Sequence, residues 1–171
     1  MKIGKTGCGE FSNLCFDLSY FNSFAMSDEV QVKPNVKKAV PFFHVINMEN
    51  SIQFYVDGIG FTVLEKWIDQ EGKLRWCWLQ LGEVALMLQE FKREGHDSWV
   101  PSGKLGEGVS IYFICDDAIA IYRDLKSRGI DATKPFVGNG MWITGCTDPN
   151  GYRLEFESFT SVPEETVFSE S

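Results

Sequence analysis

The stretch that decides the fold is VPFFHVIN at residues 40–47, because a second stretch of the same character, SIYFICDD, occurs at residues 110–117. Each is an apolar strand pattern, and each is followed by a polar turn, a short helical pattern with an aromatic residue on its apolar side, and a glycine. The two halves also end alike, with VALMLQ at residues 84–89 and YRLEFE at residues 152–157. The repetition predicts a duplicated unit whose halves enclose a ligand cleft between them.

Hydrophobic alternation and turn residues divide the two halves into the same order of elements. In the first half we expect a strand, a helix and three further strands, at residues 39–46, 49–57, 61–68, 73–81 and 84–90. In the second half we expect the same order at residues 109–115, 117–128, 131–134, 140–146 and 152–158. The predicted fold class is therefore α+β, with two βαβββ modules in tandem forming a curved mixed sheet around a cleft.

The domain boundaries follow from the same pattern. Residues 1–35 show neither helical nor strand periodicity and are expected to be a disordered extension. The two modules, joined by a linker with several glycines and followed by a loose tail, are expected at residues 36–91, 92–108 (the linker), 109–160 and 161–171 (the tail). Residues 36–160 would then form one domain.

Composition and charge limit the classes of function. The chain has 171 residues and a formal net charge of −8, which argues against a nucleic-acid partner because such a partner requires a basic face. No apolar run is long enough to span a membrane, and no signal peptide is evident, so we expect a cytoplasmic protein. The five cysteines form no C-x-x-C pair, which argues against a disulfide framework or a structural zinc site.

Alternation along the last strand of each half identifies a candidate cavity face. Leucine and phenylalanine side chains on one face are expected to pack on the helices. The opposite face then carries Met87 and Gln89 in the first half, and Arg153, Glu155 and Glu157 in the second.

In this order and spacing, residues 39–158 resemble the glyoxalase/bleomycin-resistance/extradiol-dioxygenase superfamily, also called the vicinal oxygen chelate proteins. The resemblance is carried by SIQFY at residues 51–55 with GIGF at 58–61, by the helical segment 117–129, and by TDPNGYRLE at 147–155. The superfamily contains lyases, isomerases, dioxygenases, thiol transferases and non-enzymatic drug binders. The resemblance therefore implies the fold more strongly than the reaction.

The resemblance also identifies where a catalytic metal would bind. Catalytic members hold a divalent metal with His, Gln or Glu from the first and last strands of each half, and the matching positions here are Val40, Met87, Ser110 and Glu155. Only Glu155 is a suitable ligand, so we expect no metal and no other cofactor. A divalent metal held unusually by His44, Gln89 and Glu155 stays open, and Glu155 is the one candidate catalytic residue.

A subunit or regulator whose cleft holds no small ligand stays open on the sequence, and two functions that involve a small molecule are expected ahead of it. The first is a metal-free, dimeric binding protein of the bleomycin-resistance kind, which would sequester a planar or cationic molecule, such as an antibiotic, in an aromatic cleft. The expected ligand-binding residues are Phe42, His44, Trp76, Trp78, Met87, Gln89, Ser110, Tyr112, Trp142 and Glu155. The alternative is an enzyme, either a divalent-metal-dependent lyase, isomerase or dioxygenase, or a metal-free enzyme in which Glu155 and His44 or Tyr112 act as acid and base. In both cases the expected partners are a small molecule and a second copy of the chain.

Overall fold

The computed structural model describes residues 35–92, 94, 98 and 101–170. The extension predicted over residues 1–35 lies outside this part of the chain, apart from Asn35. Lys38 and the residues that follow it belong to one compact unit. Within the described residues, no helix is long and apolar enough to cross a bilayer.

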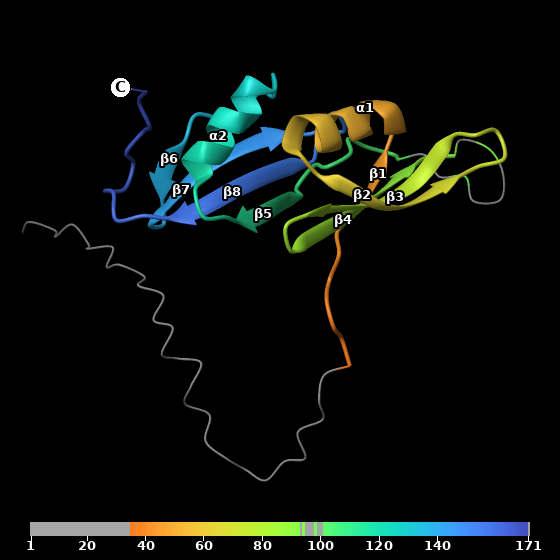
Figure 1. The fold of residues 1–171 in the computed structure, drawn as a ribbon, viewed down its shortest axis with the longest axis horizontal. Helices are drawn as coiled ribbons and strands as arrows, with labels where there is room; N and C mark the ends of the chain where they lie inside the picture. Colours follow the sequence, from red (N-terminus) through yellow and green to blue (C-terminus); the bar gives the residue numbers. More distant parts are fainter. Residues whose placement is uncertain (1–34, 93, 95–97, 99–100, 171) are drawn as a thin grey trace, which may run out of the picture. The chain divides into compact units, whose positions relative to one another are not determined.

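The first module is a four-stranded mixed sheet with a helical segment on one face (Figure 1). Its elements are β1 (Phe42–Val45), α1 (Met48–Ile52), the π-helical turn η2 (Gln53–Ile59), β2 (Thr62–Ile68), β3 (Leu74–Leu81) and β4 (Val84–Glu90). The strand order is β1-β4-β3-β2, in which β1 and β4 are parallel and the other pairs are antiparallel.

The second module repeats this arrangement. Its elements are β5 (Ser110–Ile114), α2 (Ala118–Ser127), β6 (Phe136–Gly138), β7 (Met141–Thr147) and β8 (Arg153–Phe159). The strand order is β5-β8-β7-β6, again with the first pair parallel. The predicted α+β fold with two βαβββ modules is therefore confirmed.

The helices of the two modules begin in the same way. Asn47 accepts a hydrogen bond from the backbone N–H of Asn50 at 2.9 Å, and Asp117 accepts one from that of Ala120, also at 2.9 Å. Both are side-chain N-caps, which satisfy backbone donors that have no partner inside the helix. The duplication thus extends to the capping residues.

One predicted strand is misplaced. Residues 131–134 were expected to form a strand, but they contribute one isolated bridge, between Ala132 and Cys146, and β6 begins at Phe136. Pro135 has no backbone N–H to add to a ladder. At Thr133 the backbone N–H donates to the carbonyl of Gly145 at 2.7 Å, but the N–H of Gly145 donates to the Thr133 side chain at 2.8 Å and not to a backbone carbonyl. The strand therefore starts after the proline.

The core lies between the helices and the sheets and is continuous across the two modules. Phe43 of β1 stacks on Tyr152 with ring centroids 4.1 Å apart. Phe61 and Phe113 lie edge to face, with ring centroids 6.3 Å apart. Leu86 and Leu88 are buried on the helix side of β4, as their alternation predicts. The opposite face of each sheet is left free of helices (Figure 1).

The C-terminal segment differs from the loose tail predicted over residues 161–171. The N–H of Val137 donates to the carbonyl of Thr166 at 2.9 Å, and the N–H of Phe168 donates to the carbonyl of Pro135 at 2.9 Å. The Phe168 ring makes edge contacts with Tyr122 and Trp142. The tail thus adds a short extended segment to the edge of β6, because that edge offers unpaired backbone groups.

Removing the Phe168 ring is expected to destabilise the second module. Phe168→Ala should lower the free energy of unfolding by about 1–2 kcal/mol, because a half-buried ring in an aromatic cluster is lost. Denaturant unfolding measures this value. Phe159→Ala is the matched control, since that ring is 81% exposed, and it should change the free energy by less than about 0.5 kcal/mol. Equal effects of the two variants would contradict the packing of the tail.

Candidate functional site

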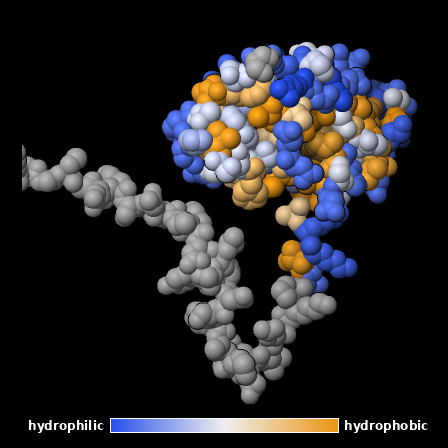
Figure 2. Space-filling model, turned by 60° about the vertical axis from the view of Figure 1, so that its left-hand side comes forward, coloured by the Kyte–Doolittle hydropathy of each residue, from blue (hydrophilic) through white to orange (hydrophobic). Residues whose placement is uncertain are grey.

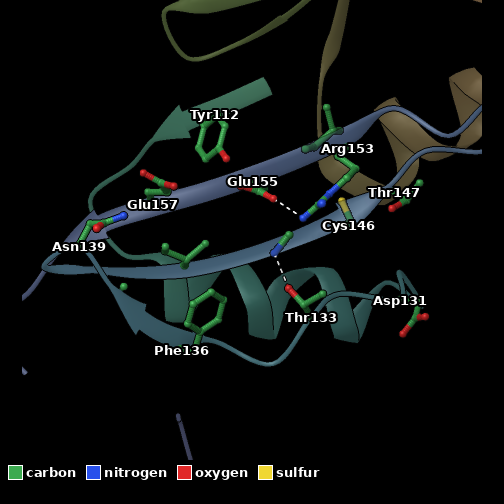
Figure 3. A pocket seen from close by; sticks show the side chains of 14 residues that line it. Tyr112, Asp131, Thr133, Phe136, Asn139, Cys146, Thr147, Arg153, Glu155 and Glu157 are labelled. Carbon is green, nitrogen blue, oxygen red and sulfur yellow. Dashed lines mark hydrogen bonds and ion pairs between the residues drawn. The ribbon is translucent and has the colours of Figure 1, made fainter. Parts of the chain in front are cut away.

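A cavity of about 540 Å³ lies on the face of the second sheet that α2 leaves uncovered (Figure 3). Cavities that hold small organic molecules commonly have volumes of about 300–1,000 Å³. Its wall comes from all four strands of the sheet and from the segment leading into β6, and the residues that matter below are Tyr112, Phe136, Ile143, Arg153, Glu155 and Glu157.

Two cross-strand rows form the floor of the cavity. In the first row, Glu155 of β8 lies between Tyr112 of β5 and Gly145 of β7. Gly145 is needed here, since a Cβ atom at this position would lie 2.8 Å from the carbonyl oxygen of Leu154 and 3.1 Å from Cγ of Glu155. The Glu155 side chain therefore lies close over the backbone of Gly145.

In the second row, Glu157 lies between Ile114 and Ile143, and Phe136 of β6 pairs with Ile143. This carboxylate thus has apolar neighbours on both sides along the sheet. The cavity combines acidic groups with an apolar wall.

The first sheet has the same two cross-strand rows, but large side chains occupy them. Its registers are Phe42 with Met87 and Trp78, and His44 with Gln89 and Trp76. Trp78 occupies the position equivalent to Gly145, and Trp76 that equivalent to Ile143. Because two indole rings stand where the second sheet has a glycine and an isoleucine, the first sheet presents an aromatic face where the second has a hollow.

Glu157 is a largely buried carboxylate in the wall of the cavity. It is 5% exposed, and no described residue donates a hydrogen bond to its carboxylate or forms an ion pair with it. Burial raises the pKa of Glu157, and the nearby charge of Glu155 raises it further. A cation entering the cavity would relieve both costs.

Glu155 already has a counter-ion. Nη2 of Arg153 lies 2.5 Å from Oε1 of Glu155, as the dashed line in Figure 3 marks. On the other side, a hydrogen bond from Tyr112 to Glu155 raises the pKa of Tyr112. The two neighbouring glutamates therefore differ, because one is neutralised within the protein and the other is not.

The rim of the cavity is held by the C-terminal segment. The turn between β6 and β7 has positive φ at Asn139 (52°) and Gly140 (71°), so that both backbone N–H groups point the same way. The Glu164 carboxylate accepts from these two groups at 3.0 and 2.7 Å. Asn139 lines the cavity, so the contact with Glu164 holds the C-terminal segment against the rim of the cavity.

The structure does not bring all the residues expected to bind a ligand together in one place. Tyr112 and Glu155 line the cavity, and Ser110 lies one row further along, paired with Arg153. Six lie on the first sheet, on strands other than those that form the cavity: Phe42, His44, Trp76, Trp78, Met87 and Gln89. Trp142 lies on β7 with its ring against Phe168, on the face that packs on α2.

The cavity also differs from the cleft that the sequence predicts between the modules. Every residue that lines it belongs to the second half of the chain. Phe136, Ile143 and Glu157 are among the cavity-lining residues that the sequence did not predict as ligand-binding residues. Alternation along β8 already places Glu157 on the open face, whereas nothing in the sequence marks Phe136 as a neighbour of Ile143.

The face of the first sheet that the helices leave uncovered is aromatic and carries cations. Lys38 lies over the Trp78 ring, with Nζ 4.7 Å from its centroid, and Lys92 lies over the Trp67 ring at 5.3 Å. Trp67 is 47% exposed and pairs with Trp76 across the strands. Figure 2 shows that apolar residues form patches among polar ones on the side of the molecule in view.

The residues at the four metal-ligand positions of the family do not fit a divalent metal. Val40 and Met87 offer no hard donor, Ser110 is a weak one, and Glu155 is engaged by Arg153. Burial lowers the pKa of His44, which lies on the first sheet. Among the described residues, no three His, Cys, Asp or Glu side chains are grouped so that they could hold a metal ion.

The family model described as the Glyoxalase/Bleomycin resistance protein/Dioxygenase superfamily matches residues 41–156. The chain belongs to this superfamily. The register of the two sheets agrees with it, since Phe42–Met87 and Tyr112–Glu155 are equivalent pairs in the duplicated modules. No curated protein matches the chain.

Solved structures of superfamily members share the fold. TnmS3, an antibiotic binding protein from Streptomyces sp. CB03234, is 21% identical with a TM-score of 0.54, and the match covers 72% of this chain and 98% of TnmS3. TioX from Micromonospora sp. ML1 is 17% identical with a TM-score of 0.58, covering 72% and 99%. A glyoxalase family protein from Enterococcus faecalis is 22% identical with a TM-score of 0.54, covering 71% and 96%. At these identities the likeness concerns the fold.

Proposed function

We propose that this superfamily member binds a small organic cation with a flat apolar body in the cavity of its second sheet, and that it does so to sequester the molecule. The observation that carries the proposal is Glu157, a carboxylate in the cavity that is largely buried and has no ion pair with any residue that the structure describes. A charged group buried in this way is costly unless it is paired, and a ligand cation would supply the missing charge.

The apolar wall favours an organic cation over a hydrated metal ion. Ile143 and Phe136 flank the row of Glu157, and Tyr112 offers an exposed ring beside it. Aromatic and aliphatic walls with a few polar groups are typical of sites for small organic molecules. The description of TnmS3 as antibiotic binding supports sequestration of an antibiotic as the purpose.

The proposal includes a homodimer in which the aromatic face of one protomer covers the cavity of the other. Both faces are free of helices in the single chain, and the tryptophan rings of the first sheet would extend the apolar wall of the cavity. Sedimentation analysis should give twice the chain mass. A monomer at all concentrations would contradict this part of the proposal.

A ligand series of one shape and three charges tests the proposal. Isothermal titration calorimetry should show that 1-naphthylmethylamine, a cation, binds at least about tenfold more tightly than 1-naphthalenemethanol, because only the cation pairs with Glu157. The anion 1-naphthoate should not bind. Equal affinity for the three compounds would contradict a charge-selective cavity.

Filling the cavity of the second sheet with a larger side chain is expected to weaken ligand binding without unfolding the protein. Ile143→Trp places in the second sheet the ring that Trp76 places in the first, so it should lower the affinity for 1-naphthylmethylamine at least about tenfold. Thermal unfolding should change little, since Ile143 faces the cavity and not the core. Ile114→Trp, at the open edge strand of the same row, is the control and should leave most of the affinity.

A further inference from the structure

Three charged residues alternate along β8. Arg153, Glu155 and Glu157 are two residues apart, so their side chains project from the same face of the strand, and all three line the cavity. Successive members of this row are separated by about 6.6 Å along the strand. The cavity thus contains two carboxylates and one guanidinium at regular spacing.

The guanidinium group of Arg153 pairs with only one of the two carboxylates. Arg153 is bound to Glu155, and Glu157 has no ion pair within the described residues. Glu155 is 13% exposed and Arg153 is 64% exposed, so the carboxylate is fixed in the cavity wall while its counter-ion reaches in from solvent. A ligand with a second cation could occupy the position beside Glu155 only by displacing Arg153.

The neighbouring residues on the other strands add no charge beside Glu157. Beside Glu157 lie Ile114 of β5 and Ile143 of β7, neither of which carries charge. At the cavity edge, Asp131 lies 3.9 Å from Lys126 as a solvent-exposed ion pair. The charge available to a ligand in the two rows is therefore one carboxylate.

We propose that Arg153 determines the charge of the ligand: by neutralising Glu155 it leaves Glu157 to pair with the ligand, so that the cavity selects organic monocations over dications. This inference rests on the proposed function, since it specifies the ligand of the same cavity. Arg153 acts through Glu155 and is a positioning residue with respect to the ligand.

The test compares a monocation with a dication of the same ring. 1-Naphthylmethylamine carries one ammonium group, and 1,4-bis(aminomethyl)naphthalene carries two on opposite sides of one ring, a spacing comparable with that of the two glutamates. In the wild-type protein the monocation should bind at least about threefold more tightly than the dication, because the second ammonium group finds no free carboxylate. In Arg153→Gln the ratio of dication to monocation affinity should rise about tenfold, because Glu155 is freed.

Three further variants make the result specific. Arg153→Met keeps the apolar stem and should give the same rise, so the result does not depend on one substitution. Arg153→Lys restores the cation and should return the ratio to the wild-type value. Lys66→Gln removes one positive charge from β2 and should leave the ratio unchanged.

The outcomes separate the two proposals. If the monocation binds the wild-type protein and the ratio does not rise in Arg153→Gln and Arg153→Met, the role given to Arg153 is overturned and the proposed function stands. If the monocation does not bind the wild-type protein, or binds Glu157→Gln equally well, the proposed function fails and the role of Arg153 fails with it.

Discussion

Replacing Glu157 by glutamine is expected to lower the affinity for 1-naphthylmethylamine by about 10–100-fold, because a hydrogen bond to a charged group contributes about 1.5–3 kcal/mol. The same substitution should raise the free energy of unfolding of the unliganded protein by about 1 kcal/mol, since it removes a buried charge that forms no ion pair within the described part of the chain. Calorimetric titration measures the first effect and denaturant unfolding the second. Opposite changes in binding and stability are typical of a residue kept for function.

The effect of pH on the Glu157→Gln variant has a definite sign. Because the pKa of Glu157 is raised in the folded protein, the folded state holds this proton more tightly than the unfolded state does. The wild-type carboxylate therefore costs nothing below the ordinary glutamate pKa, and its cost grows as the pH rises through the raised value. The stability difference between Glu157→Gln and the wild type should increase from pH 4 to pH 7, while ligand affinity of the wild type falls as the pH is lowered.

Glu83→Gln is the control for both measurements. It removes the same charge from the exposed turn between β3 and β4, and it should leave affinity and stability near their wild-type values. A loss of affinity in Glu83→Gln equal to that in Glu157→Gln would show that net charge, and not the cavity, attracts the ligand.

Asp148→Ala is expected to lower the free energy of unfolding by about 3 kcal/mol. Asp148 is 4% exposed, and its carboxylate accepts from the backbone N–H groups of Asn150 and Tyr152 at 2.8 and 2.9 Å. It also accepts from the hydroxyl of Tyr55, which lies in the other module, at 3.2 Å. Removing the carboxylate leaves several buried donors without a partner, each at a cost of about 1–3 kcal/mol.

The measurement is denaturant unfolding with three comparison variants. Tyr55→Phe deletes one donor and should cost about 1 kcal/mol, and Asp148→Asn should fall between Tyr55→Phe and Asp148→Ala. Asp116→Ala, at an exposed position of the second module, should cost less than about 0.5 kcal/mol. A loss below 1 kcal/mol in Asp148→Ala would contradict its role in joining the two modules.

The fold could be predicted from the sequence because the modules are duplicated. Strand alternation correctly placed Leu86 and Leu154 in the core and Glu155 on the open face. The helices expected from residues 49 and 117 begin within one residue of these positions, at Met48 and Ala118. These features depend on residues close to one another in the sequence, so one sequence is enough to predict them.

The site was less predictable because it depends on what faces each residue across the strands. Tryptophans drew attention to the first sheet, yet the cavity lies on the second sheet, where Gly145 and Ile143 stand at the positions of the two tryptophans. The support of the rim by Glu164 depends on a backbone turn 24 and 25 residues away in sequence. The expected cytoplasmic location stays a prediction.

The most direct measurement is a crystal structure of the full chain with 1-naphthylmethylamine. We expect the ring against Ile143 and Phe136 in the cavity of the second sheet, and the ammonium nitrogen about 3 Å from a carboxylate oxygen of Glu157. A ligand bound on the tryptophan face of the first sheet, with Glu157 unpaired, would contradict the proposed site.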